Sequence, residues 1–139
     1  MNIADIMTTD LFTLGMDSTV ADIKLAFDTR GFHHVPILRD GTVVGIVSDR
    51  DVLRQISPLA YTDWANEQAL KTLEKKAHQI MSRQLKTVRP DTGIKAAATA
   101  MLAGGVSCLL VTSEAGDLLG IVTSKDLLGY FIQQRESGV

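Results

Sequence analysis

The segment Gly45-Ile46-Val47-Ser48-Asp49-Arg50-Asp51 occurs twice in this chain of 139 residues, the second time as Gly120-Ile121-Val122-Thr123-Ser124-Lys125-Asp126. In each copy, a glycine is followed after three positions by a hydroxyl residue and after six by an aspartate. The β-branched residues favour a strand, and Ser or Thr is a preferred N-cap of a helix. We therefore expect a strand that ends at Ser48 or Thr123, with Asp51 or Asp126 in the first turn of the helix that follows.

This arrangement offers two groups that a nucleotide could use. The free N–H groups and the positive dipole end of a helix N-terminus attract an anion, and the hydroxyl adds another donor. A carboxylate one turn further on can accept hydrogen bonds from the diol of a ribose, as acidic residues do in dinucleotide folds. The alternative is that Ser48 and Thr123 only cap their helices. The recurrence of the whole segment favours nucleotide binding.

A longer internal repeat surrounds these two segments. Ile6-Met7-Thr8 matches Ile80-Met81-Ser82, and Asp17-Ser18 matches Asp91-Thr92, both at a spacing of 74 residues. From Gly41 and Gly116 onward the spacing is 75 residues, so the second hairpin turn has one extra residue. The repeat predicts a first repeat at residues 1–56, a helical connector at 57–77, and a second repeat with a C-terminal helix at 78–139.

Each repeat has the pattern of a β-α-β-β-α unit. In the first, Val20, Ile23, Ala26 and Phe27 form the apolar face of a helix, and Asp40-Gly41 is a typical hairpin turn. The predicted strands and helices are 12–14, 17–30, 34–38, 42–47 and 49–56, then 87–88, 93–103, 107–112, 117–122 and 125–134. This is a mixed α+β fold. Neither half can bury both faces of so small a sheet, so we expect the halves to pack together.

The connector predicts a helix of its own. Thr62-Asp63 can cap a helix over residues 67–76, in which Glu67 and Lys71 form a favourable i, i+4 pair. Trp64 and Tyr61 lie near its start. We expect these aromatic side chains to pack the connector onto the body of the protein, and the alternative is a surface that binds a partner.

Composition excludes several classes of function. The net charge is −2 with Lys and Arg scattered along the chain, which argues against binding to nucleic acid. The single cysteine, Cys108, lies in an apolar run and is expected to be a buried, inert thiol; no Cys/His spacing suggests a metal site. The N-terminus lacks the features of a signal peptide, and no apolar run of about 18 residues predicts a membrane span. We therefore expect a cytoplasmic protein.

The sequence also lacks the features of an enzyme. It has no Ser-His-Asp or Cys-His arrangement, no Gly-rich phosphate loop of the Walker type, and no cluster of metal ligands. We expect a protein that binds a ligand without catalysing a reaction.

The ordered motifs resemble the cystathionine-β-synthase (CBS) domain family. The resemblance rests on the repeated Gly-hydrophobic-x-Ser/Thr-x-x-Asp segment, on the openings Ile6-Met7-Thr8 and Ile80-Met81-Ser82, and on His33-His34-Val35-Pro36-Ile37. It implies two repeats packed about a pseudo-twofold axis as a Bateman module with two clefts. It further implies an adenine nucleotide (AMP, ADP or ATP) as ligand, with S-adenosylmethionine as an alternative, and a homodimer that regulates an unidentified protein.

The resemblance also implies roles for individual residues. Asp51 and Asp126 would each hold a ribose diol, Ser48 and Thr123 would contact phosphate or ribose, and Ile46 and Ile121 would flank the nucleotide. In the family each cleft borrows from the other repeat. The Asp51 cleft would be completed by Thr87, Val88, Val106 and Ser107, and the Asp126 cleft by Thr13, Leu14, Phe32 and His33. Arg50 and Lys125 are candidate phosphate contacts, or simply solvated cations.

The two repeats differ in their candidate cations. His33-His34 in the first repeat becomes Ser107-Cys108 in the second, and Arg30-Gly31 becomes Gly104-Gly105. The second repeat thus offers fewer groups for phosphate, and the clefts need not be equally strong. Adjacent strand residues point to opposite faces, so His33 and His34 are not expected to share a metal. The favoured function is a ligand-sensing regulatory module, and the alternative is a constitutive dimeric scaffold with vestigial clefts.

Overall fold

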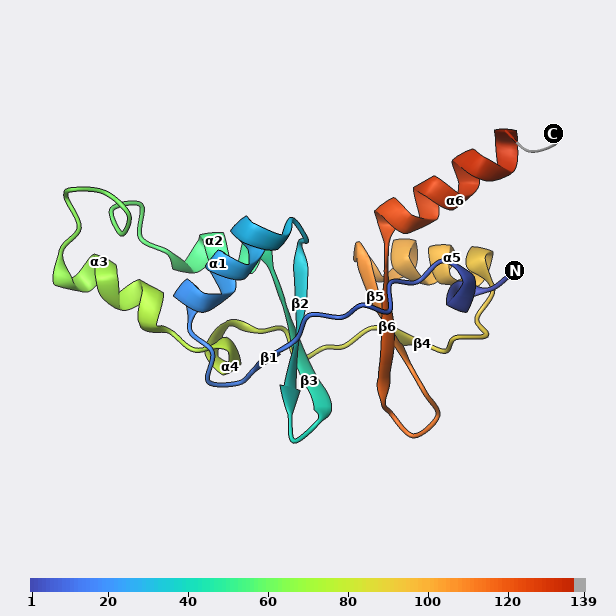
Figure 1. The fold of residues 1–139 in the computed structure, drawn as a ribbon, viewed down its shortest axis with the longest axis horizontal. Helices are drawn as coiled ribbons and strands as arrows, with labels where there is room; N and C mark the ends of the chain where they lie inside the picture. The colour runs from blue at the N-terminus through green and yellow to red at the C-terminus, as the bar shows by residue number, and fades with distance from the viewer. Residues whose placement is uncertain (137–139) are drawn as a thin grey trace. The chain divides into compact units, whose positions relative to one another are not determined.

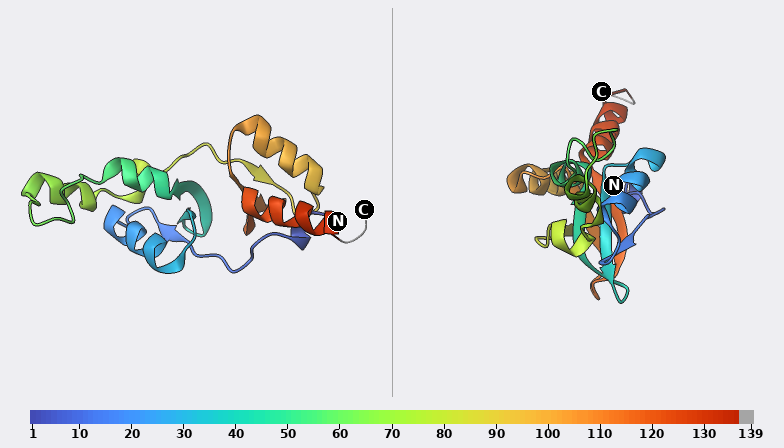
Figure 2. Two further views of the ribbon diagram at one scale, coloured as in Figure 1. Left: turned by 90° about the horizontal axis from the view of Figure 1, so that it is seen from above. Right: turned by 90° about the vertical axis from the view of Figure 1, so that its left-hand side faces the viewer.

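The computed structural model describes residues 1–136 and shows a mixed α+β protein with two small sheets (Figures 1 and 2). The chain forms two compact units. One is built from residues 12–84 and is called the 12–84 unit. The other combines residues 1–11 with residues from 85 onward and is called the 85–139 unit.

The 12–84 unit contains a three-stranded sheet in the order β1-β2-β3. β1 (Leu14–Gly15) pairs in parallel with β2 (His34–Arg39), which pairs in antiparallel with β3 (Thr42–Ser48). The helices are α1 (Val20–Arg30), α2 (Asp49–Gln55), α3 (Glu67–Lys71) and α4 (Ala77–Ile80), with a 3₁₀ turn, η2 (Thr72–Glu74), after α3. The β2–β3 turn is formed by Asp40 and Gly41, both with positive φ, which is typical of a tight hairpin.

The 85–139 unit repeats this plan with a sheet in the order β4-β5-β6. β4 (Thr87–Val88) pairs in parallel with β5 (Cys108–Thr112), and β5 pairs in antiparallel with β6 (Leu118–Thr123). α5 (Ile94–Gly104) and α6 (Ser124–Glu136) lie next to each other (Figure 1), and η1 (Ile3–Asp5) joins them from the start of the chain.

Each unit has its own apolar core. The core of the 12–84 unit joins α1, β2, β3 and α2 to residues of α4, and the predicted apolar face of α1 is buried. Val20 and Ile23 have no exposed surface there. In the other unit, Ile3 of η1 has no exposed surface and packs among residues of α5, β5, β6 and α6. The first residues of the chain therefore belong to the core that the second repeat builds.

The opening motif of each repeat lies on the last strand of the unit built mainly from the other repeat. Thr8 exchanges two backbone hydrogen bonds with Ile121 of β6 (2.8 and 3.0 Å), and Ser82 exchanges two with Ile46 of β3 (3.0 and 2.9 Å). The preceding methionines cover glycines of the same strands: a Cβ placed on Gly120 would lie 2.7 Å from the Met7 sulfur, and one placed on Gly45 would lie 2.7 Å from Met81 Cγ. Each of these pairs satisfies the backbone groups of one residue on the outer edge of β3 or β6.

Most of the predicted elements are confirmed, with shifts of one to three residues at their ends. The largest shift is at the start of the helix predicted from residue 17. Thr19 caps α1 through a reciprocal pair of hydrogen bonds with Asp22, and α1 therefore begins only at Val20. The fold class is the predicted one. The repeat boundaries at 1–56, 57–77 and 78–139 remain a prediction about the sequence, whereas the compact units divide the chain near residues 11 and 84.

Two predictions for the connector are wrong. Its helix α3 is capped by Asn66, whose side chain accepts a hydrogen bond from Ala69 N at 2.7 Å, and it gives way to the 3₁₀ turn η2 after Lys71. Trp64 and Tyr61 do not pack the connector onto the body, since they are 80% and 60% exposed. The Lys24 ammonium lies over the Tyr61 ring in a cation–π contact, 4.9 Å from the ring centroid.

Cys108 is buried, as predicted, and burial raises the pKa of its thiol to about 12. Over the described residues, no helix combines the length and the apolar character that crossing a membrane requires.

Candidate functional site

The two predicted aspartates lie where the sequence placed them, in the first turn of α2 and of α6. Ser48 ends β3 and caps α2: its hydroxyl accepts a hydrogen bond from Asp51 N at 3.2 Å, and its own N–H donates to Asp51 Oδ2 at 2.8 Å. Thr123 ends β6 and makes the same pair with Asp126, at 3.3 and 2.8 Å. Each site thus begins with a complete capping box.

The capping box uses one oxygen of each carboxylate, and no hydrogen bond from the described residues reaches the other oxygen. Both bonds from the cap residues that reach a carboxylate go to Oδ2, and the Thr123 hydroxyl adds a third, at 3.0 Å, to Oδ2 of Asp126. Asp51 forms an ion pair with Arg54, whose Nη1 lies 3.9 Å from Oδ1. The Asp51 side chain is 27% exposed. Capping and binding are therefore compatible, because Oδ1 can still accept from a ribose hydroxyl while Oδ2 holds the cap.

Thr8 and Ser82 are neighbours of these sites that sequence reasoning missed. Thr8 pairs with Ile121, two residues before Thr123, and Ser82 pairs with Ile46, two residues before Ser48. Both Thr8 and Ser82 are exposed. Their presence in the repeated Ile-Met-Thr/Ser motif is the sequence feature that could have indicated them.

His33 is tied to the first residue of α2. Its Nδ1 lies 2.8 Å from Asp49 Oδ2, and its carbonyl accepts a hydrogen bond from Asp49 N at 3.0 Å. In the other unit Ser107 O accepts the equivalent backbone bond from Ser124 N at 2.9 Å, without a side-chain partner of that kind. His34, next in β2, is partly buried, and burial lowers its pKa below the usual value. A phosphate role for His33 remains a prediction.

The remaining candidate residues fall into two groups, one in each unit. Thr13, Leu14 and Phe32 lie with His33 in the 12–84 unit, where Leu14 and Phe32 pack against its core. Thr87, Val88, Val106 and Ser107 lie in the 85–139 unit, and Val88 and Val106 pack against its core. The assignment of each group to the aspartate of the other repeat remains a prediction. Arg50 and Lys125 are exposed and form no ion pair within the described part of the chain.

The groups in this arrangement are suited to binding a polar ligand. Among residues 1–136 no group of three or more His, Cys, Asp or Glu side chains is placed to hold a metal ion. What each unit offers is a helix N-terminus, a hydroxyl, a carboxylate and an apolar strand residue. This set can hold a phosphate and a sugar.

Comparison with known proteins identifies the family. The model of the CBS domain matches the chain twice, at residues 3–58 and 77–133. The chain belongs to the CBS domain family. A CBS domain-containing protein of Dictyostelium discoideum is 30% identical over 136 residues, which cover 96% of this chain and 93% of that protein.

Solved structures of CBS proteins share the fold. A protein named for acetoin utilization (AcuB) from Vibrio cholerae is 28% identical, with a TM-score of 0.80 and coverage of 100% of this chain and 98% of that chain. CBSX2 of Arabidopsis thaliana, solved in complex with AMP, is 27% identical, with a TM-score of 0.78 and coverage of 96% and 98%. These CBS pairs cover nearly the whole chain.

Some relatives carry the matching region within a much longer protein. Homoserine O-acetyltransferase of Methanohalophilus mahii is 30% identical over 125 residues, which are 89% of this chain and 23% of the acetyltransferase. The similarity therefore concerns about a quarter of that enzyme, and its activity is not carried over to this chain.

Proposed function

We propose that this CBS pair is a non-catalytic regulatory module that binds an adenosine-containing nucleotide of the AMP, ADP or ATP class. The observation that carries the proposal is the duplicated capping box beside a helix N-terminus, in which Oδ1 of Asp51 and of Asp126 accepts no hydrogen bond from the described residues. The complex of the related CBSX2 with AMP supports an adenine nucleotide as the ligand. Asp51 and Asp126 then bind the ribose, and Ser48 and Thr123 lie beside the phosphate or ribose.

Regulation requires that the ligand binds two states of the module with different affinity. The backbone pairs of Ile46 with Ser82 and of Ile121 with Thr8 connect each proposed ligand site to a segment that leads from one compact unit to the other. Nucleotide binding is therefore expected to alter the two segments around residues 8–12 and 82–85. A regulated protein would detect this change.

The module is also expected to form a homodimer. In the 85–139 unit, Leu102 of α5 and Leu128 and Ile132 of α6 are 84%, 63% and 58% exposed. Apolar helical side chains with this exposure are typical of an interface. Sedimentation velocity on the purified protein tests the dimer, and a monomer at all concentrations would contradict it.

Calorimetric titration with AMP, ADP, ATP and S-adenosylmethionine tests the ligand. We expect binding of at least one adenine nucleotide, and expect Asp51→Asn and Asp126→Asn each to remove or weaken one site. An asparagine can keep the cap bond through its oxygen but presents an NH₂ group in place of the second acceptor. Binding of S-adenosylmethionine alone would move the assignment to that ligand.

Asp22→Asn is the matched control. Asp22 forms a capping box with Thr19 at the start of α1, with both hydrogen bonds at 3.2 Å, but it belongs to no proposed site. The Asp22→Asn variant loses the same capping charge, but its affinity for nucleotide should not change. If neither Asp51→Asn nor Asp126→Asn changed the affinity, the ribose assignment would be wrong. If no nucleotide bound at all, a constitutive scaffold would replace the sensor.

A further inference from the structure

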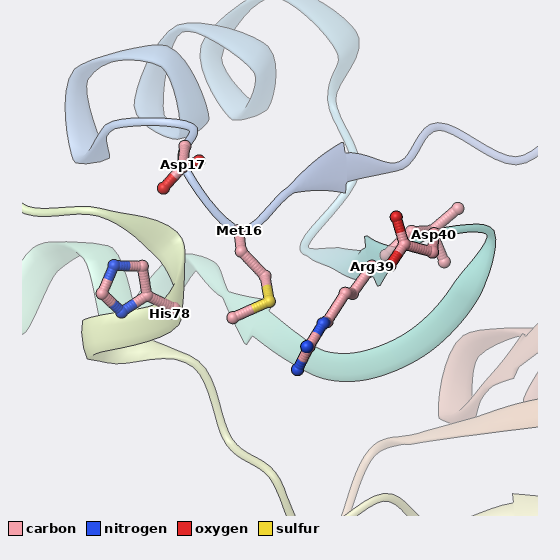
Figure 3. A pocket seen from close by; sticks show the side chains of 6 residues that line it. Met16, Asp17, Arg39, Asp40 and His78 are labelled. Carbon is pink, nitrogen blue, oxygen red and sulfur yellow. The ribbon is translucent and has the colours of Figure 1, made fainter.

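A cavity whose lining contains neither Ser48 nor Asp51 lies in the 12–84 unit. Figure 3 shows the side chains that line it. It has a volume of about 490 Å³ and lies where β1 and β2 end, next to α4. Its lining residues are Met16, Asp17, Leu38, Arg39, Asp40 and His78. A volume of this size accommodates a small metabolite.

Backbone hydrogen bonds fix the frame of this cavity. His78 N donates to Met16 O at 3.1 Å, Ala77 N to Ser18 O at 2.8 Å, and Val20 N to Lys75 O at 2.7 Å. These three bonds hold α4 against the loop that leads from β1 to α1. The cavity is therefore built on positioned backbone, which favours a preorganised site.

The other unit shows what fills the equivalent place. At the repeat spacing of 74 residues, Gly15 corresponds to Arg89, Leu38 to Thr112 and Arg39 to Ser113. The frame is the same, since Ala4 N donates to Pro90 O at 3.0 Å where His78 N donates to Met16 O. In the 85–139 unit the Arg89 guanidinium donates to the carbonyl oxygens of Thr112 and Ser113.

Gly15 leaves this place without a side chain in the 12–84 unit. No atom lies within 4 Å of a Cβ placed on Gly15, and its φ is not positive, so the position could carry a larger residue. A guanidinium is thus the group that the repeat itself uses here, and in the 12–84 unit it would have to come from outside. Asp17 and Asp40 line the cavity and add negative charge for such a cation, although Asp17 Oδ1 also lies 3.7 Å from Lys76 Nζ.

The cavity also offers groups for an anion. Figure 3 shows the Met16 thioether between the His78 ring and the Arg39 guanidinium. Neither the Arg39 side chain nor the His78 ring has a hydrogen-bond or ion-pair partner among the described residues. The corresponding residues in the other unit, Ser113 and Ala4, carry no cation. An arginine side chain binds a carboxylate through two parallel hydrogen bonds.

We propose that the cavity between the ends of β1 and β2 and helix α4 binds a small zwitterion with a guanidinium or ammonium group at one end and a carboxylate at the other, a basic amino acid. The cationic end takes the place that Arg89 fills in the other unit, near Asp17 and Asp40. The carboxylate end binds Arg39 and His78, and Met16 and Leu38 contact the aliphatic part. The site is separate from the capping boxes and does not depend on nucleotide binding.

Calorimetric titration of the full chain with L-arginine tests the proposal. We expect saturable binding that weakens about tenfold or more with agmatine, which lacks the carboxylate, and with L-citrulline, whose neutral side chain lacks the guanidinium charge. Equal binding of agmatine would show a site for cations only, and equal binding of citrulline would remove the cation from the argument; either result overturns the zwitterion. If L-arginine produced no heat in the titration and no change in the amide NMR signals of the protein, the site itself would be overturned.

The chain supplies its own blocking variant, Gly15→Arg. The new arginine should occupy the cavity as Arg89 does in the other unit, and L-arginine should bind at least about tenfold more weakly. Gly129→Arg on α6 is the control, because it adds the same charge at another glycine with no atom within 4 Å of its Cβ. If Gly15→Arg did not fold, Arg39→Gln and Asp40→Asn would test the two ends separately. Unchanged binding of L-arginine in these variants would contradict the proposal, whatever the nucleotide titrations show.

Discussion

Met81 lies directly over Gly45, where its side chain occupies the space that a Cβ would need: a Cβ on Gly45 would lie 2.7 Å from Met81 Cγ and 3.1 Å from Met81 Cβ. Gly45 belongs to the first repeat and Met81 to the opening motif of the second. The same relationship recurs between Gly120 and Met7. The glycine at the head of the repeated segment is therefore required by packing of a methionine from the other repeat, one residue before the backbone pair of Ile46 with Ser82 or of Ile121 with Thr8.

Gly45→Ala should destabilise the protein by about 1–3 kcal/mol, because the added methyl group overlaps Met81 in a closely packed place. Urea denaturation of the variant measures this. Gly15→Ala is the control, since nothing lies within 4 Å of its Cβ. Combining Gly45→Ala with Met81→Ala should make the alanine at 45 less costly than it is alone, and strict additivity of the two substitutions would contradict the contact.

Ser48→Ala should reduce the free energy of unfolding by about 1 kcal/mol, the usual cost of losing an N-cap. It should also weaken nucleotide binding at the Asp51 site. The two effects are separated with Thr19→Ala, which removes the equivalent cap of α1 but touches no proposed site. Equal loss of affinity in both variants would show that stability, and not ligand contact, causes it.

Stability should fall as the pH falls below about 6.5, in part because of His34. Its pKa is lowered by burial, with smaller opposing effects from Asp49 and Asp51 and a lowering effect from His33. The unfolded chain then binds a proton that the folded chain resists, so acid favours unfolding. Denaturation at pH 8 and at pH 5.5 should show a smaller difference for His34→Gln than for the wild type. An unchanged difference would mean that His34 does not contribute.

Cys108 should not react with thiol reagents in the native protein at pH 8. Burial raises the pKa of its thiol to about 12, with a smaller effect of the same sign from Asp126, so the thiolate is scarce. Reaction should become rapid in denaturant. Since the unfolded thiol ionises near its usual value of 9.0, stability should decline as the pH rises from about 9 toward 12. Rapid native labelling at pH 8 would contradict the burial.

The sequence predicted the elements and the caps well because both depend on short-range patterns. The apolar face from Val20 to Phe27, the Asp40-Gly41 turn and the cap residues Ser48 and Thr123 are all local features. The exchange of Met7 and Met81 between repeats could not be predicted, since no local pattern states which strand an opening motif will meet. The exposure of Trp64 and Tyr61 was also missed, because the sequence pattern does not indicate whether another part of the protein covers an aromatic side chain.

The site shows the same division. The spacing of Ser48 and Asp51 indicated both a cap and a ligand; the structure shows the cap, which uses Asp51 Oδ2, and the ligand remains a prediction. The cavity that begins next to Gly15 could not be recognised as a candidate site from the sequence. Its recognition requires comparing the positions of Gly15 and Arg89 in the two folded units. The repeat spacing and the matching backbone bonds of α4 and η1 together make these positions equivalent.

The burial of Ile3 in the core of the 85–139 unit sets an order of events for a chain that is being synthesised. Ile3 is synthesised before residues 12–84, whereas its core neighbours Val122 and Leu127 are synthesised after them. The 12–84 unit can fold as soon as residue 84 has emerged, but residues 1–11 must wait until their partners beyond residue 84 have emerged as well. Closing so long a loop is slow relative to local folding, and Met7 and Thr8 are therefore expected to dock after the 12–84 unit has folded.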